Sequence, residues 1–290
     1  MSDLHELLRQ KPFKLKEGFL EYWIPIYLFI RRDEYALYRN DVYLPYLNFE
    51  ILDLLMRGIQ KYQIKTFHIQ GIRLELFNKY RELIRQPEVE DVKESNFINT
   101  IKPFIVFYNR EINDYARKTN RITDDAKAFR KAVKGAKELE KVFFEDLLTN
   151  FGVSLNDLAS SEDILNSYVK RVKTAMQELT AVYANLIERI EENILEELGL
   201  EGKTYTPYFK AIKKRYAPLK NYLLTDKQKI FKARLFSEFD SPEKYFSSIS
   251  SALVGKSLDK INDEEEFILH NKIKQSLREL DNLLEIANLE

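Results

Sequence analysis

Apolar side chains return at helical spacing along most of this chain of 290 residues. Between residues 161 and 198 they recur every three to four positions, and Ser161 followed by two acidic residues is typical of a helix start. This pattern predicts one long helix, about 55 Å in length at 1.5 Å per residue. Similar patterns predict further helices over residues 1–10, 17–32, 48–57, 72–85, 98–115, 124–151, 206–222, 226–239, 242–254 and 263–288.

The N-terminal part also carries strand signals. β-Forming residues flank the pair Asn40-Asp41. Both side chains tolerate the left-handed backbone of a two-residue turn, so residues 35–45 are expected to form a β-hairpin. A second stretch, from Ile64 to Ile69, also has strand character.

The predicted helix over 17–32 is apolar on most sides, so we expect it to be buried at the centre of its domain, with a kink or a break at Pro25. The polar, acidic stretch 87–95 indicates a linker. The sequence therefore predicts a mainly α protein. A small N-terminal α/β winged-helix-like module with a β-hairpin occupies residues 1–86, and a helical bundle with one long helix occupies residues 97–290.

Composition narrows the function classes. Lys plus Arg and Asp plus Glu both number 46, so attraction to nucleic acid or an anionic membrane would need a local patch. The chain has no cysteine, which excludes disulfides, thiolate catalysis and iron–sulfur clusters. Its most apolar stretch is about 12 residues long, short of the roughly 20 that span a bilayer. Because no secretory signal is visible either, we expect a cytoplasmic protein without a membrane partner.

Motifs for chemistry are sparse. Eight scattered glycines form no phosphate-binding loop. Of three widely spaced histidines, His270 falls on the apolar stripe of the last helix and is expected in a core or an interface. The acidic run 263–266 is expected on the surface, where negative charge favours a helix start. We therefore expect no catalytic residue, no metal ligand and no cofactor.

One segment stands out by its charge. Between residues 203 and 234 ten basic side chains accompany a single acid, Asp226, and aromatic residues are interleaved with them. Such a segment can neutralise phosphates and stack on unpaired bases. Alternatively, the aromatic residues face the core and the bases form an ordinary surface. The basic residues are Lys203, Lys210, Lys213, Lys214, Arg215, Lys220, Lys227, Lys229, Lys232 and Arg234.

The N-terminal module offers a second candidate surface for DNA. Arg31 and Arg32 precede the predicted hairpin, and Arg39 lies near its tip. In winged-helix readers a helix enters a groove while the hairpin touches the backbone. The apolar character of the helix over 17–32 favours packing against another domain instead.

Three parts of the sequence resemble a known family: residues 11–18 with 33–38, residues 124–132 with 143–147, and residues 178–186. Their helix starts and apolar spacing resemble the region downstream of the P-loop domain in large bacterial phage-defence ATPases, including BREX-type systems. The resemblance covers roughly residues 11–200, and the family's nucleotide-binding motifs are absent. It implies a winged-helix-like segment followed by a helical assembly region, without ATPase activity of its own.

Three hypotheses remain open. The first is a non-catalytic interaction and assembly module that contacts other protein subunits or an ATPase domain, and also DNA or RNA. Its signature is apolar and aromatic surface left exposed on the isolated chain. The second is a stand-alone nucleic-acid-binding protein that uses the basic-aromatic segment 203–234. The third is an enzyme of unrecognised type, which would need a deep pocket with carboxylates converging around a histidine.

Overall fold

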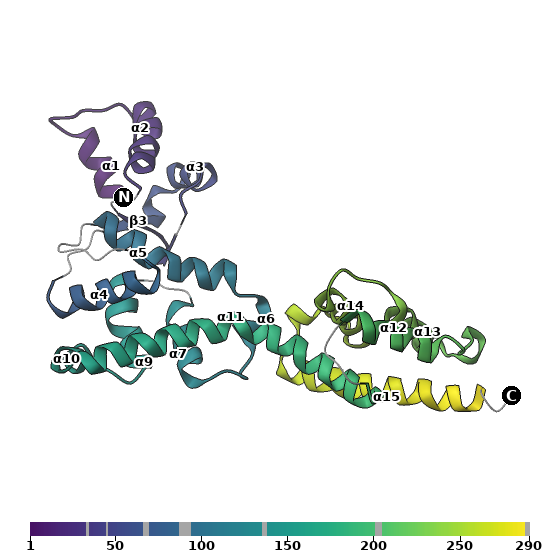
Figure 1. Ribbon diagram of the computed structural model, residues 1–290. Coiled ribbons are helices and arrows are strands. Elements are labelled where there is room, and N and C mark those ends of the chain that lie inside the picture. The colour runs from purple at the N-terminus through teal and green to yellow at the C-terminus, as the bar shows by residue number, and fades with distance from the viewer. Residues whose placement is uncertain are drawn as a thin grey trace. The chain divides into compact units, whose positions relative to one another are not determined.

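The computed structural model describes residues 1–32, 35–44, 46–65, 70–86, 94–134, 138–200 and 205–287. Within them the chain is mainly helical, with a small three-stranded antiparallel sheet near the N-terminus (Figure 1). The chain forms two compact units. Unit 1 comprises Met1–Glu111 and Thr123–Gln177, and unit 2 comprises Ile112–Ile122 and Glu178–Glu290.

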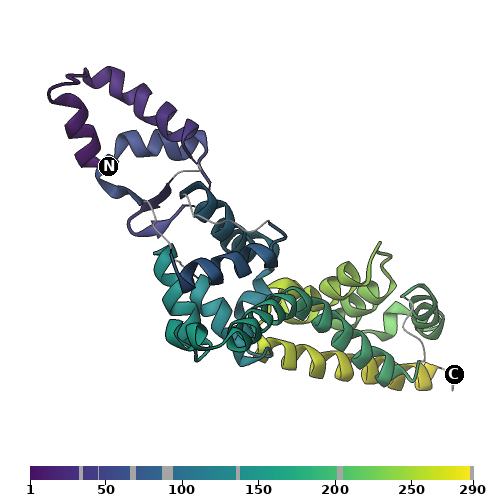
Figure 2. The same ribbon diagram turned by 60° about the vertical axis from the view of Figure 1, so that its left-hand side comes forward.

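Three helices open unit 1: α1 (Ser2–Arg9), α2 (Glu17–Ile30) and α3 (Phe49–Arg57). The side chain of Asn48 accepts a hydrogen bond from the backbone N–H of Ile51 at 2.9 Å, which satisfies a free donor at the start of α3. α2 and α3 pack together, and α2 continues through Pro25 without a break (Figure 2). Their shared core contains Leu8, Leu20, Ile24, Leu28, Tyr35, Leu37, Leu52, Leu55 and Tyr62.

The sheet has the strand order β2-β1-β3, with β1 at Ala36–Arg39, β2 at Val42–Tyr43 and β3 at Tyr62–Lys65. Asn40 and Asp41 have φ angles of 49° and 63°, the left-handed pair that a tight hairpin turn requires. Because side chains alternate across a strand, Leu37 joins the core of α1–α3 while Tyr38 faces the other way and accepts a hydrogen bond from the N–H of Leu139 at 3.0 Å.

The rest of unit 1 surrounds a core rich in aromatic rings. Tyr80 is fully buried, with the rings of Phe104 and Phe143 edge-on at 5.6 and 5.7 Å. Its hydroxyl lies 3.0 Å from the carbonyl oxygen of Phe143 and 2.7 Å from the hydroxyl of Tyr168. The helices are α4 (Ile72–Leu83), α5 (Glu94–Val106), α7 (Asp124–Val133), α8 (Leu139–Lys141), α9 (Leu147–Asn150) and α10 (Leu155–Ser160), with a 3₁₀ turn at Ile59–Lys61 and π-helical turns at Phe107–Glu111 and Val142–Asp146.

The long helix α11 (Glu162–Leu198) contributes to both units. In unit 2 its second half lies alongside α15 (Asp263–Ala287), as both views show (Figures 1 and 2). The core contains Tyr245, whose ring lies 5.6 Å from that of Phe209. The other elements are α6 (Asp114–Lys118), α12 (Tyr205–Tyr216), α13 (Asp226–Phe236), α14 (Pro242–Val254) and 3₁₀ turns at Asn221–Leu223 and Leu258–Lys260.

Most predicted elements are confirmed, including the hairpin and the long helix. Three predicted helices are wrong in their continuity: 98–115 is interrupted between Glu111 and Asp114, 124–151 ends its first part at Val133, and 206–222 ends at Tyr216, before the 3₁₀ turn at Asn221–Leu223. The linker 87–95 and the end of the predicted strand at 66–69 lie largely outside the described residues. The predicted domains, 1–86 and 97–290, divide the chain differently from the two units, since residues 97–111 and Thr123–Gln177 join the N-terminal segment in unit 1.

Candidate functional site

Exposed apolar side chains concentrate in the N-terminal segment of unit 1. We define the apolar face as Phe19, Tyr22, Ile26, Phe29 and Ile30 of α2 together with Phe49 of α3. Each of these side chains is at least 42% exposed, and the most exposed are Tyr22 at 73% and Phe49 at 86%. A monomeric protein rarely leaves so many large apolar groups together on its surface, so the apolar face is a candidate binding surface.

The expected burial of the helix over 17–32 is therefore wrong for half of its surface. Leu20, Ile24 and Leu28 are fully buried, as predicted. At 100° per residue, Tyr22 and Ile26 project from the opposite side of α2, where the described residues provide no cover for them. The apolar pattern was read correctly, but it does not distinguish burial within the chain from burial against another molecule.

A groove runs between α2 and α3 beside the apolar face. Its volume is about 630 Å³, and charged Glu21, Asp53 and Arg57 lie at its rim. The rings of Phe29 and Phe49 stack at 6.4 Å across the two helices, which fixes one end of the groove. Pro25 and Leu52 are also part of its wall. The surface is thus preformed and apolar at its centre, as sites for amphipathic helices are.

The basic segment lies in unit 2 and its members have different environments. Lys210, Lys214, Lys220, Lys227 and Arg234 are exposed and form no ion pair within the described residues. Lys203 lies outside the described residues. The others are engaged: Lys213 with Glu238 at 2.7 Å, Arg215 with Asp281 at 2.9 Å, Lys229 with Asp226 at 3.0 Å, and Lys232, which is buried and donates to the carbonyl oxygen of Leu219.

The aromatic residues of this segment mostly face the core. Tyr208, Phe209, Tyr216 and Phe231 are buried, which removes them as stacking platforms for bases. Tyr222 is the exception, at 73% exposure and with the ammonium of Lys220 6.0 Å from its ring centre.

The three arginines of the N-terminal module lie in different surroundings. Arg31 and Arg32 are exposed at the end of α2. The guanidinium of Arg32 lies 4.9 Å from the ring centre of Phe29 and donates to its carbonyl oxygen at 3.0 Å. Arg39 packs over the ring of Tyr62 at 5.7 Å. Arg32 therefore borders the apolar face.

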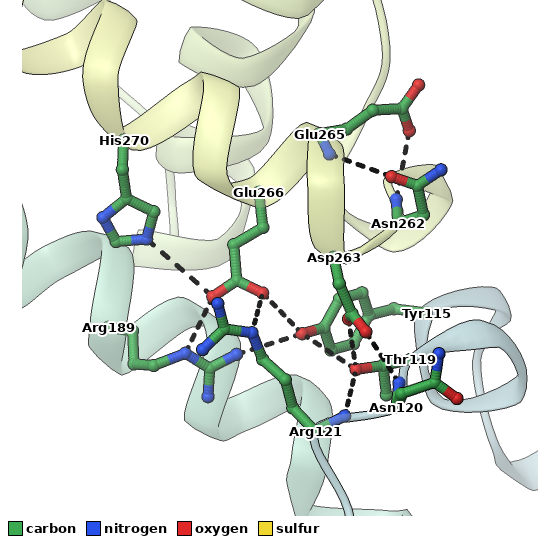
Figure 3. A network of polar contacts seen from close by, with 10 residues as sticks. All are labelled: Tyr115, Thr119, Asn120, Arg121, Arg189, Asn262, Asp263, Glu265, Glu266 and His270. Atoms are coloured by element: carbon green, nitrogen blue, oxygen red, sulfur yellow. Dashed lines mark hydrogen bonds and ion pairs between the residues drawn. The ribbon is translucent and has the colours of Figure 1, made fainter.

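Sequence reasoning missed a buried carboxylate in unit 2 (Figure 3). Glu266 is only 1% exposed, so its predicted surface position is wrong. Its carboxylate accepts hydrogen bonds from the hydroxyl of Tyr115 at 2.7 Å and from Nε of Arg189 at 2.8 Å, and Arg121 lies at 3.4 Å. A signal was present, because Glu266 is in register with the buried stripe Leu269, Ile273, Leu277 and Leu280.

The same network fixes the segment 112–122 to α15. Asp263 accepts from the hydroxyl of Thr119 at 2.5 Å and from the N–H of Asn120 at 2.8 Å. Burial raises the pKa of Tyr115 to about 12, and hydrogen bonding from Thr119 acts in the opposite direction. Almost all polar atoms of this cluster are satisfied by one another, so its geometry is that of a structural brace.

His270 lies at the edge of this network, with Nε2 3.8 Å from Glu266. Its side chain is 23% exposed, between core and surface. Burial lowers its pKa, the charge of Glu266 opposes that shift, and the charges of Arg189, Arg121 and Lys274 reinforce it. The imidazole therefore favours its neutral form in the folded chain.

A hollow of about 720 Å³ in unit 1 is polar and carries charges of both signs. Lys65, Lys131, Lys134 and Lys141 line it together with three carboxylates, and Lys65 pairs with Glu138 at 3.1 Å. No histidine is among the described residues that line it. The arrangement expected of a general acid–base site is therefore not assembled there.

Among the described residues no helix is both long and apolar enough to cross a membrane, and no group of three or more acidic or histidine side chains is placed to hold a metal ion. Comparison with known proteins found no matching family model, no matching curated protein and no matching solved structure.

Proposed function

We propose that this chain is a non-catalytic interaction and assembly module that binds other protein subunits through the apolar face of α2 and α3. The observation that carries the proposal is the double-sided apolar character of α2, which leaves Tyr22, Ile26 and Ile30 in water although Leu20, Ile24 and Leu28 already fill its core side. Burying such side chains stabilises a complex by about 25 cal/mol for each Å² removed from water.

The resemblance to the region downstream of the P-loop domain in phage-defence ATPases belongs to this proposal. It supplies one class of partner, an ATPase domain. Within the N-terminal module, the winged-helix-like identity is likewise part of the proposal, and the observed hairpin and its neighbouring helices are compatible with it.

The test is recovery of bound proteins from the native host with a tagged chain. Wild type is compared with the double variant Tyr22→Ser, Ile26→Ser and with a control, Phe267→Ser, Ile268→Ser, which removes equally exposed apolar groups from α15. We expect proteins, further copies of the chain included, that bind wild type and the control but not the α2 variant. Recovery of the same proteins with all three chains would contradict the proposal, as would recovery of none.

A second function, nucleic-acid binding by the basic segment, is favoured by one observation. Lys210 and Lys214 stand four residues apart on α12, exposed and without ion pairs within the described residues, and Tyr222 remains available for stacking. Each phosphate contact releases counterions, so affinity would fall steeply with salt.

Fluorescence anisotropy with labelled single- and double-stranded DNA and RNA at about 50 and 200 mM salt tests this second function. We expect the double variant Lys210→Glu, Lys214→Glu to lose binding, and Lys131→Glu, Lys134→Glu in unit 1 to retain it despite the same change in net charge. Absence of binding by wild type at the lower salt concentration would eliminate the nucleic-acid function and leave the assembly function untouched.

A further inference from the structure

The hollow of about 720 Å³ in unit 1, which we call the polar hollow, lies where three parts of the chain meet. They are the sheet, through the hairpin turn and β3, the end of α7, and the helical run 139–150 that comprises α8, a π-helical turn and α9. Pockets for small ligands measure about 300–1,000 Å³, so the polar hollow has the size of one.

Three ammonium groups that line the polar hollow have no ion pair. They belong to Lys131 and Lys134 at the end of α7 and to Lys141 in the helical run, and none of the three has an acidic partner within the described residues. The fourth lysine, Lys65, is paired with Glu138 at 3.1 Å. Because unpaired cations from two segments border one space, the polar hollow favours a ligand that carries negative charge.

A buried hydroxyl adds a hydrogen-bond donor to the same lining. Tyr38 is 1% exposed, and its hydroxyl accepts from the backbone N–H of Leu139 at 3.0 Å. The proton of this hydroxyl has no acceptor in the part of the chain that the structure describes. Burial raises the pKa of Tyr38 to about 12, the N–H of Leu139 opposes that shift, and the charge of Glu138 adds to it. The phenol therefore keeps its proton at neutral pH and can donate it to a bound acceptor.

The polar hollow also carries acceptors. Asp41 and Asp146 line it and form no ion pair with other described residues, and the side-chain amides of Gln63 and Asn150 line it as well. Carboxylates repel the anionic part of a ligand but accept hydrogen bonds from its hydroxyl groups. A compound with both phosphoryl and hydroxyl groups thus has a complement in the lining for each of its parts.

We propose that the polar hollow binds a small phosphorylated compound with free hydroxyl groups, whose phosphoryl oxygens contact Lys131, Lys134 and Lys141. Phosphoryl oxygens accept several charge-assisted hydrogen bonds at once, which these ammonium groups supply together with the hydroxyl of Tyr38. Sugar phosphates and nucleotides share this chemistry, and the experiment below distinguishes them. The polar hollow shares no lining residue with the apolar face, so the proposal goes beyond the assembly function and does not depend on it.

Isothermal titration calorimetry of the full chain tests the proposal. Fructose 1,6-bisphosphate and ADP represent the two sources, and pyrophosphate represents phosphoryl groups without hydroxyl groups. At low salt we expect one of the two esters to bind with a Kd below about 100 µM and more tightly than pyrophosphate, and the tighter ester identifies the source. Absence of binding by both esters, or equal binding of pyrophosphate, overturns the proposal.

A pair of double variants tests the assigned lysines. Lys131→Gln, Lys141→Gln removes two of the three ammonium groups and is expected to weaken binding of the tighter ester at least about tenfold. The control Lys170→Gln, Lys173→Gln changes the net charge equally at exposed positions of α11 and is expected to bind as wild type does. Circular dichroism checks that both variants are folded. Equal affinities of the two variants would contradict the assignment.

Lysine acetylation read out by mass spectrometry locates the bound ester. With the tighter ester at a saturating concentration, acetylation is expected to slow at Lys131, Lys134 and Lys141 and to stay unchanged at Lys170 and Lys173. Equal protection of both sets would show general attraction to surface lysines and would overturn the site, as would protection of neither set. None of these outcomes bears on the native-host experiment with the apolar face.

Discussion

Replacement of Glu266 tests the network that fixes the segment 112–122 in unit 2. Glu266→Gln keeps the size of the side chain but removes its charge, and its amide group cannot accept from both Tyr115 and Arg189 in their present positions. Removing one partner of a fully buried ion pair costs about 3–5 kcal/mol. Arg189 and Arg121 are 32% and 49% exposed, so water can solvate them after the change. The loss of stability is therefore about 2–3 kcal/mol.

The assay is urea unfolding followed by far-ultraviolet circular dichroism, combined with amide hydrogen exchange across residues 112–122. The matched control is Glu264→Gln, an exposed member of the same acidic run, which is expected to change stability by less than about 0.5 kcal/mol. Exchange in the 112–122 segment is expected to accelerate only in Glu266→Gln. Equal stabilities of the two variants would refute the reasoning that Glu266 carries the brace.

Three other predictions concern single positions. Folding lowers the pKa of His270 below 6.5, so as the pH falls through 6.5 a proton binds to this imidazole in the unfolded chain but not in the folded one. The unfolding free energy is therefore expected to decrease from pH 6.5 down to the folded pKa, and His270→Gln is expected to flatten this part of the stability–pH curve. Asn48→Ala removes the cap of α3 and is expected to cost about 1 kcal/mol in chemical denaturation, and an unchanged midpoint would count against the cap. Asp41→Gly relieves a left-handed backbone that costs a residue with a Cβ about 1–2 kcal/mol, against about 0.5–1 kcal/mol for the freedom of glycine in the unfolded chain, so the unfolding free energy is expected to rise by about 0.5–1 kcal/mol. A loss of stability would mean that the Asp41 side chain itself supports the hairpin.

Local signals predicted much of the fold because they act over a few residues. Asn40-Asp41 forms the turn of the hairpin, and α11 begins directly after Ser161 with two acidic residues in its first turn. The π-helical turn at Phe107–Glu111 and the end of α7 at Val133 were missed. A π-helical turn adds one residue to the helix, and the apolar spacing before and after it is still typical of a helix.

The candidate surfaces were less predictable, because apolar and charged patterns do not reveal which molecule covers them. The sequence of α2 indicated burial on all sides, but its own domain covers only the side of Leu20. In the basic segment the aromatic residues were candidates for stacking, and packing in unit 2 uses most of them in the core. Glu266 was visible only as an acid in register with an apolar stripe, and its partners, Tyr115 and Arg189, lie far from it in the sequence.

The most direct test of the central claim is the accessibility of position 26 inside cells. In Ile26→Cys the rate of alkylation by a small maleimide is measured in the native host and in the purified chain at high dilution, with Phe267→Cys, exposed on α15, as the reference. If a protein partner covers the apolar face, alkylation at position 26 is slower in cells by about an order of magnitude, while position 267 reacts equally in both settings. Equal rates at position 26 in cells and at high dilution would contradict the claim that this chain works through the apolar face of α2.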